Sequence, residues 1–72
     1  MKIKYDEKYD TMYIELIPGN YECRTIRLSE EISLNIGPGE ILIGIEILDA
    51  SEIIGNGAFP TVTLENLKLE TG

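Results

Sequence analysis

The 72-residue chain contains no histidine, no tryptophan and a single cysteine, Cys23. These absences exclude an internal disulfide, a Cys/His zinc site, a Ser-His-Asp triad and a Cys-His dyad. We therefore expect no catalytic residue, no metal and no cofactor. Enzymatic activity stays open, but the composition favours a protein without it. The single cysteine, next to Arg24, fits a structural thiol in a reducing cytoplasm better than a secreted scaffold held by disulfides.

Positive charge is also scarce, since six Lys and Arg residues against thirteen Asp and Glu residues give a formal net charge of −7. Nucleic-acid binding draws its affinity from neutralised phosphates, and these scattered basic residues form no footprint for them. We expect no nucleic-acid binding by this chain alone. A basic protein is the partner that the charge favours, although the same charge also keeps a small protein soluble.

Long apolar runs are missing, because the longest, 41–45, has only the length of a strand. The first residues alternate with lysines and form no apolar segment for export. We therefore expect a cytoplasmic protein that does not bind membranes. The sequence also lacks glutamine and has few Asn, Cys and Met residues, which is one trend among thermophile proteins.

The chain is 43% hydrophobic and 26% charged, and its length suits a single domain, residues 1–72, that buries roughly 60% of its surface. Alternation of apolar and polar residues predicts an α+β fold, a small antiparallel sheet of about five strands with meander-like order. The expected strands are 2–5, 11–17, 21–28, 32–36 and 41–48. The last is apolar on both faces, which is typical of a central strand.

The segment 21–28 changes the parity of its apolar residues, so either it contains a β-bulge or the strand begins near Arg24; we favour a bulge or a twist. One short helix is expected after the Ile-rich strand, because Asp49 with Glu52 three residues later resembles a capping box. Residues 55–57 end this helix. Beyond Phe59-Pro60, four apolar residues fit either a last strand or an amphipathic turn: Val62, Leu64, Leu67 and Leu69.

Two turns resemble binding sites, one for phosphate and one for a cation, but a structural interpretation is favoured for both. Gly37-Pro38-Gly39 leads into another strand and not into a helix, so it predicts a hairpin turn and no phosphate loop. Asp6, Glu7 and Asp10 offer oxygen ligands for a cation, but their spacing matches no calcium loop. A solvated turn with Asp side chains bonded to the backbone is favoured there.

Tyr5, Tyr9 and Tyr13 recur every four residues, and packing in the core and at its rim is favoured over a stacking platform, because no positive groove accompanies them. Gly44 leaves room for close approach by backbone or by a bulky neighbour. Both observations bear on packing before they bear on function.

Glu15, Glu46 and Asp49 are the candidates for paired carboxylates in acid–base chemistry, but nothing in the sequence orients a substrate beside them. Glu46 lies in the most apolar strand, where a buried carboxylate needs a partner such as Arg24, Arg27 or Tyr13. An ion pair or a dimer contact is favoured for Glu46, with solvent exposure and catalysis as the alternatives.

Two segments, Lys4-Tyr5-Asp6-Glu7-Lys8-Tyr9-Asp10-Thr11-Met12-Tyr13-Ile14 and Ile43-Gly44-Ile45-Glu46-Ile47-Leu48-Asp49-Ala50-Ser51, resemble the DUF2283 family of small prokaryotic proteins of unassigned function. The resemblance covers residues 1 to about 54 and leaves 58–72 as a C-terminal extension. Family members usually carry acidic residues in the turn before the second motif, where this chain has Gly37-Pro38-Gly39-Glu40. The motif positions of unknown role are Tyr5, Asp6, Asp10, Tyr13, Gly44, Glu46 and Asp49.

The resemblance implies a compact antiparallel sheet with one helix and no established activity or catalytic residue. Genes of the family are sometimes found beside those of small proteins that resemble ribonuclease-type toxins. The resemblance therefore also implies an antitoxin-like or adaptor role. The leading hypothesis is a non-enzymatic protein–protein interaction module, a homodimer that binds another protein by charge and by sheet edges. The alternatives are a small ligand-binding protein or enzyme with a pocket at a dimer interface that uses Glu46, Asp49 and a tyrosine, and a purely structural role.

Overall fold

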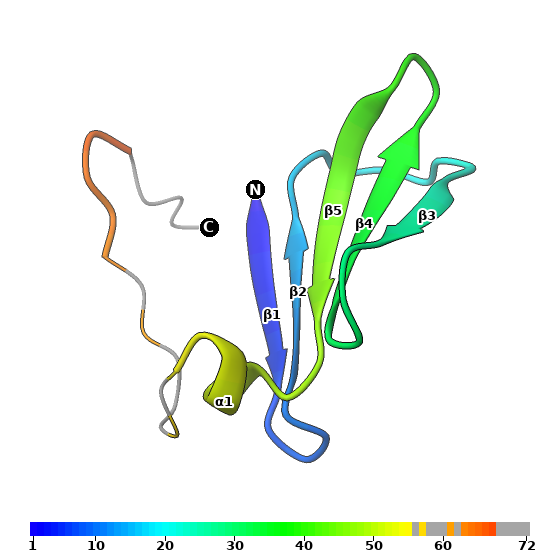
Figure 1. The fold of residues 1–72 in the computed structure, drawn as a ribbon. Helices are drawn as coiled ribbons and strands as arrows, with labels where there is room; N and C mark the ends of the chain where they lie inside the picture. Colours follow the sequence, from blue (N-terminus) through cyan, green and yellow to red (C-terminus); the bar gives the residue numbers. More distant parts are fainter. Residues whose placement is uncertain (56, 58–60, 62, 68–72) are drawn as a thin grey trace.

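In the computed structural model, which describes residues 1–55, 57, 61 and 63–67, the chain forms one antiparallel sheet followed by a short helix (Figure 1). The strands are β1 (Lys2–Asp6), β2 (Thr11–Glu15), β3 (Arg24–Arg27), β4 (Ile32–Gly37) and β5 (Ile41–Ile47), and the helix is α1 (Ala50–Ile53). The expected α+β fold, with five strands and a helix after the Ile-rich strand, is confirmed.

The strand order across the sheet is β1-β2-β5-β4-β3, and each neighbouring pair is antiparallel. Consecutive strands pair within β1-β2 and within β3-β4-β5, as a meander requires, but β2 pairs with β5 and not with β3. Segment 16–23 therefore carries the chain across β5 and β4 to the far edge of the sheet (Figure 1). β5 lies at the centre of the sheet, as its two apolar faces predicted.

The register separates the sheet into two faces, because residues directly opposite each other in antiparallel strands share a face. One face carries a row of aliphatic residues with one member from every strand, and beside it a second row from four strands. We call this the apolar face; its rows are Ile3, Ile14, Ile45, Leu34 and Ile26, and Tyr5, Met12, Ile47 and Ile32. The opposite, polar face carries the row Lys4, Tyr13, Glu46, Ser33 and Arg27.

The core is small and lies where α1 meets the second apolar row. Met12, Ile47 and Ala50 form the buried cluster, and Tyr5, Ile14 and Ile45 pack against it from the sheet. In the described part of the chain, Ile43 is the one further hydrophobic residue that is buried. The first apolar row is therefore only partly covered, and Ile3 at its end is 41% exposed.

The favoured bulge in segment 21–28 is wrong and the alternative is confirmed, since β3 begins at Arg24 and residues 21–23 belong to the preceding loop. The irregularity lies instead between β4 and β5, where Asn35 is opposite Gly44 and Ile36 is opposite Leu42. Ile43 is the extra residue, and its carbonyl accepts hydrogen bonds from the amides of Leu16 (2.8 Å) and Ile17 (3.2 Å). These bonds hold the chain against β5 just beyond the end of β2.

Other boundaries differ by one or two residues from the expected ones: β2 ends at Glu15, β5 at Ile47 and α1 at Ile53. Of the expected C-terminal apolar residues, Leu64 and Leu67 are described, exposed, and outside any helix or strand. Phe59, Pro60, Val62 and Leu69 lie outside the described residues. Among the residues that the structure describes, no helix has the length and apolarity needed to cross a bilayer.

Candidate functional site

Asp10 ties the β1–β2 turn to the start of α1, although the two segments are far apart in the chain. Its carboxylate accepts hydrogen bonds from the Ser51 hydroxyl (2.6 Å), the Ser51 amide (3.0 Å) and the Tyr5 hydroxyl (2.6 Å). Its carbonyl accepts a fourth bond from the Ala50 amide (2.8 Å). Asp10 adopts the left-handed conformation, with φ 54°, which Asp tolerates better than most residues. The side chain therefore caps a helix that begins forty residues further on.

These hydrogen bonds lower the pKa of Asp10 and raise the pKa of Tyr5. The bonds from Ser51 and then from Tyr5 hold the pKa of Asp10 below its usual value of 3.8. The hydrogen bond from Tyr5 to Asp10, together with desolvation and the Asp10 charge, raises the pKa of Tyr5 to about 12. Tyr5 thus keeps its proton and Asp10 stays ionised at neutral pH. A general acid or base works best with a pKa near the operating pH, so this pair suits a structural tie better than proton transfer.

Asp6 also acts on the backbone of its own turn. Its carboxylate accepts hydrogen bonds from the amides of Lys8 (3.0 Å) and Tyr9 (3.3 Å). This is the Asx-type turn expected for this segment, because a short Asp side chain can satisfy amides that follow it closely. No group of three or more His, Cys, Asp and Glu side chains stands close enough for a metal ion within 1–55, 57, 61 and 63–67.

Tyr13, on the polar face, lies over the backbone of Gly44 in the neighbouring strand. A Cβ atom built on Gly44 would overlap the hydroxyl and the ring of Tyr13. The Tyr13 hydroxyl accepts a hydrogen bond from the Asn35 amide nitrogen (3.2 Å), and the Asn35 carbonyl oxygen accepts one from the Thr25 hydroxyl (3.1 Å). The expected close approach of a bulky neighbour at Gly44 is confirmed, and a chain of polar contacts runs from β2 across to β3.

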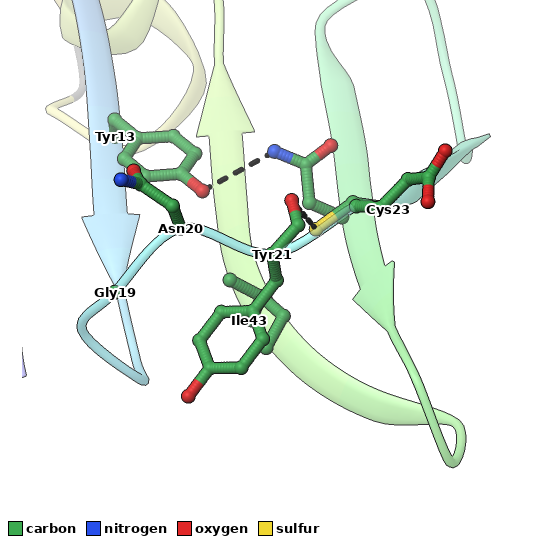
Figure 2. A pocket seen from close by; sticks show the side chains of 8 residues that line it. Tyr13, Gly19, Asn20, Tyr21, Cys23 and Ile43 are labelled. Atoms are coloured by element: carbon green, nitrogen blue, oxygen red, sulfur yellow. Dashed lines mark hydrogen bonds between the residues drawn. The ribbon is translucent and has the colours of Figure 1, made fainter.

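Beside this contact lies an open cavity of about 460 Å³, between the polar face and the loop that leads to β3. Figure 2 shows the loop passing over the strands, with Tyr13, Asn20, Tyr21 and Cys23 around the hollow and Ile43 beneath it. Cys23 is exposed, and its thiol donates a weak hydrogen bond to the Tyr21 carbonyl (3.5 Å). The cavity offers tyrosine and asparagine side chains and one charged residue, Glu22.

Glu46 and Asp49 do not come together as a carboxylate pair. Glu46 is exposed on the polar face, directly opposite Tyr13 and Ser33. Within the described chain, the one salt bridge joins Arg24 to Glu40 and leaves Glu46 outside it, so the expected ion pair is not formed. A dimer contact at Glu46 stays a prediction. A second cavity, about 150 Å³, lies beside Glu46 and is lined also by Lys4, Asp6, Thr11, Met12 and Tyr13.

Asp49 occupies the position before α1 but its side chain makes no capping hydrogen bond, and its backbone is left-handed with φ 50°. The capping role that we predicted for the Asp49 side chain is wrong, because Asp10 already accepts from the first helical amides: its carboxylate from Ser51 and its backbone carbonyl from Ala50. Two residues that sequence reasoning missed complete these sites: Ser51, which binds Asp10, and Asn35, which binds Tyr13. The Ala-Ser dipeptide at a helix start was the signal available for Ser51; Asn35 had none.

Negative charge gathers where three turns meet at one end of the sheet. The Leu48 amide donates to the Glu31 carbonyl (2.8 Å), and the Ala50 amide donates to the Asp10 carbonyl, so the turns before β2, β4 and α1 lie together (Figure 1). The nearby basic residues are Lys4, Lys8 and Arg27, and Arg27 is engaged with the carbonyls of Ser29 and Glu30. We call this the acidic end; its carboxylates are Asp6, Glu7, Asp10, Glu30, Glu31, Asp49 and Glu52.

The fold and these contacts define a small single-sheet α+β protein whose motif residues mainly hold turns and strands together. Residues 2–51 match DUF2283, a family described as proteins of unknown function, and the chain belongs to that family. The resemblance stated from the two motifs is thereby confirmed. No curated protein matches the chain, and no solved structure matches it either.

Proposed function

We propose that this protein is a non-enzymatic protein–protein interaction module that binds a basic protein, in the manner of an adaptor or antitoxin. The observation that carries this proposal is the segregation of charge from apolar surface. Seven of the thirteen carboxylates lie at the acidic end, whereas no strand residue on the apolar face is acidic. A concentrated patch of one sign steers an oppositely charged partner and raises its association rate.

The contacts of the motif residues support binding over catalysis. Asp6 and Asp10 are occupied by backbone amides, by Ser51 and by Tyr5, and the pKa values of Asp10 and Tyr5 move away from neutrality. Their role is to fix the turn and the helix start in place. Exposed carboxylates on the same segments, those of Glu7, Glu30 and Glu52, are then presented on a rigid frame. Rigid presentation lowers the entropic cost of binding.

Charge reversal tests the proposal with a matched control. Glu7→Lys/Glu30→Lys changes the acidic end, whereas Glu22→Lys/Glu65→Lys makes the same change of net charge elsewhere; all four residues are exposed. The tagged full chain retrieves basic proteins from the cytoplasm of its source cells, and the recovered protein is purified and titrated against each variant by calorimetry. We expect at least about a tenfold loss of affinity for the first pair and less than about threefold for the second.

Equal losses in both pairs would mean that total charge, and not this surface, governs binding. Unchanged affinity after reversal at the acidic end would refute the proposal. Raising the salt concentration must weaken the wild-type complex, because exposed charges are screened.

The cavity next to Tyr13 favours one other function, small-ligand binding. Its volume and its aromatic and amide lining suit a small polar ligand with a flat ring. Asn35→Ala removes the hydrogen bond to Tyr13. The rise in Tm that a ligand causes is to be measured for this variant and for the wild type. A ligand that raises the Tm of the wild type but not of Asn35→Ala would favour this function over the first.

A further inference from the structure

We propose that the apolar face of the sheet binds a second copy of this chain, so that two sheets pack face to face in a symmetric dimer. This inference goes beyond the proposed function, which concerns the acidic end. It starts from the first apolar row, which crosses the sheet without interruption from Ile3 on β1 to Ile26 on β3. Ile14, Ile45 and Leu34 fill the row between them.

The helix covers only part of this face. α1 has four residues, and the buried cluster beneath it consists of Met12, Ile47 and Ala50. The residues of the first row are partly or largely exposed, although three of them lie on the interior strands of the sheet. A sheet with one apolar face needs a second layer to bury it, and in the described part of the chain α1 supplies only one end of that layer.

The charges on this face point to a second copy as the occupant. Its strand residues include no carboxylate, and its one charged side chain, Arg24, already pairs with Glu40. Glu15 and Glu46 project from the opposite, polar face. Two chains of net charge −7 can therefore bring these faces together while the carboxylates of the strands stay apart. A basic partner gains no electrostatic attraction here and is drawn to the acidic end instead.

The dimensions of the uncovered part of the face set the size of the interface. Five strands spaced about 4.8 Å apart make a width of about 24 Å, and the two rows that α1 leaves clear, the first and a third, span about 14 Å along the strands. The third row is Arg24, Ile36 and Leu42. The projected area is about 340 Å², so each partner buries less than the roughly 800 Å² of a standard interface. Two-fold packing would place row against row, with the sheets about 10 Å apart.

The test uses neighbouring residues of one edge strand that face opposite ways. Ile26→Glu puts a carboxylate into the first row, whereas Thr25→Glu adds the same charge to the polar face. Ile3→Glu repeats the change at the other end of the row, at a side chain already 41% exposed, so that folding is kept. Circular dichroism verifies the fold of each full-length variant, and sedimentation equilibrium over a series of concentrations measures its mass.

We expect the wild type to sediment at twice the chain mass of 8.1 kDa. Ile26→Glu and Ile3→Glu should raise the dimer dissociation constant at least about a hundredfold, and Thr25→Glu less than about threefold. A wild type that stays monomeric at every concentration overturns the proposal. A dimer that persists in both Ile26→Glu and Ile3→Glu also overturns the proposal. The same holds for a dimer that Thr25→Glu weakens as much as Ile26→Glu does, because both results indicate pairing through strand edges.

These outcomes are separable from those of the proposed function. Ile3→Glu can be monomeric and still bind the basic protein. If charge reversal at the acidic end then abolishes that binding, the proposed function stands without the dimer. A dimer that binds no basic protein leaves the dimer proposal intact.

Discussion

The phenol ring of Tyr13 lies against the backbone of Gly44, at a separation that leaves no space for a side chain on Gly44. The two residues belong to the paired strands β2 and β5, and the hydroxyl of Tyr13 reaches beyond Gly44 to Asn35 on β4. One tyrosine thus spans three strands on the polar face. The packing explains the Gly in the Gly-Ile-Glu-Ile motif without assigning it a part in chemistry.

Gly44→Ala is therefore expected to destabilise the fold by about 1–3 kcal/mol, the usual cost of forcing an extra group into a packed position. Urea unfolding followed by circular dichroism measures the change. The double variant Gly44→Ala/Tyr13→Ala provides the control, because removing the ring makes room for the new methyl group. A double variant whose loss is the full sum of both single losses would show that the two residues do not interact.

Asp10→Asn should lower the Tm by roughly 4–8 °C, because the amide replaces a charged acceptor of bonds from Ser51 and Tyr5. Asp49→Asn is the matched control. Both residues have left-handed backbones, which Asn also tolerates, but the Asp49 side chain makes no capping bond. Calorimetry that found equal losses in both variants would contradict the assignment of the helix cap to Asp10.

Alkaline pH should weaken the fold through Tyr5. The pKa of Tyr5 is raised from 10.0 to about 12 in the native state, so its stabilising contribution is complete below pH 10 and is lost as pH rises towards 12. Urea midpoints measured between pH 8 and pH 11.5 should fall more steeply for the wild type than for Tyr5→Phe, which has no proton to lose. Parallel pH profiles for the two proteins would show that Tyr5 is not responsible.

Glu40→Gly should stabilise the protein slightly, by about 0.5–1 kcal/mol. Glu40 is held at φ 60° in the β4–β5 turn, a conformation that costs a side-chain-bearing residue about 1–2 kcal/mol and Gly very little. The exposed salt bridge to Arg24 that is lost contributes less than about 1 kcal/mol. Glu40→Ala separates the two effects, since it loses the ion pair and keeps the strained backbone; equal stability of the Ala and Gly variants would exclude relief of strain.

Much of the local structure follows from the sequence alone. Alternation of apolar and polar residues was enough to predict the hairpin around Asp6–Asp10, the strand ending near Ile36, the turn at Gly37-Pro38-Gly39 and the central Ile-rich strand. These features depend on side-chain period and on turn residues within a few positions of one another. The helix after Asp49 was also predicted, although from a capping box whose side-chain hydrogen bond does not form.

The candidate sites depend on contacts that local patterns do not encode. Asp10 caps a helix forty residues away, Tyr13 meets Gly44 and Asn35, and the bulge falls at Ile43 and not before β3. The contact of Tyr13 with Gly44 required knowing that β2 pairs with β5, and the bulge required the register of β4 against β5.

The sequence by itself determined which segments are strands, where the chain turns, the acidity of the protein and the chemistry that a chain without His cannot perform. The tertiary structure alone decided the strand order, the register and hence which side chains share a face. The physical reason is that propensity and alternation act within a segment, whereas the pairing of β2 with β5 is selected by burial and hydrogen bonding across the whole sheet. Only that pairing aligns Ile3, Ile14, Ile45, Leu34 and Ile26 in one row and brings the acidic turns to one end.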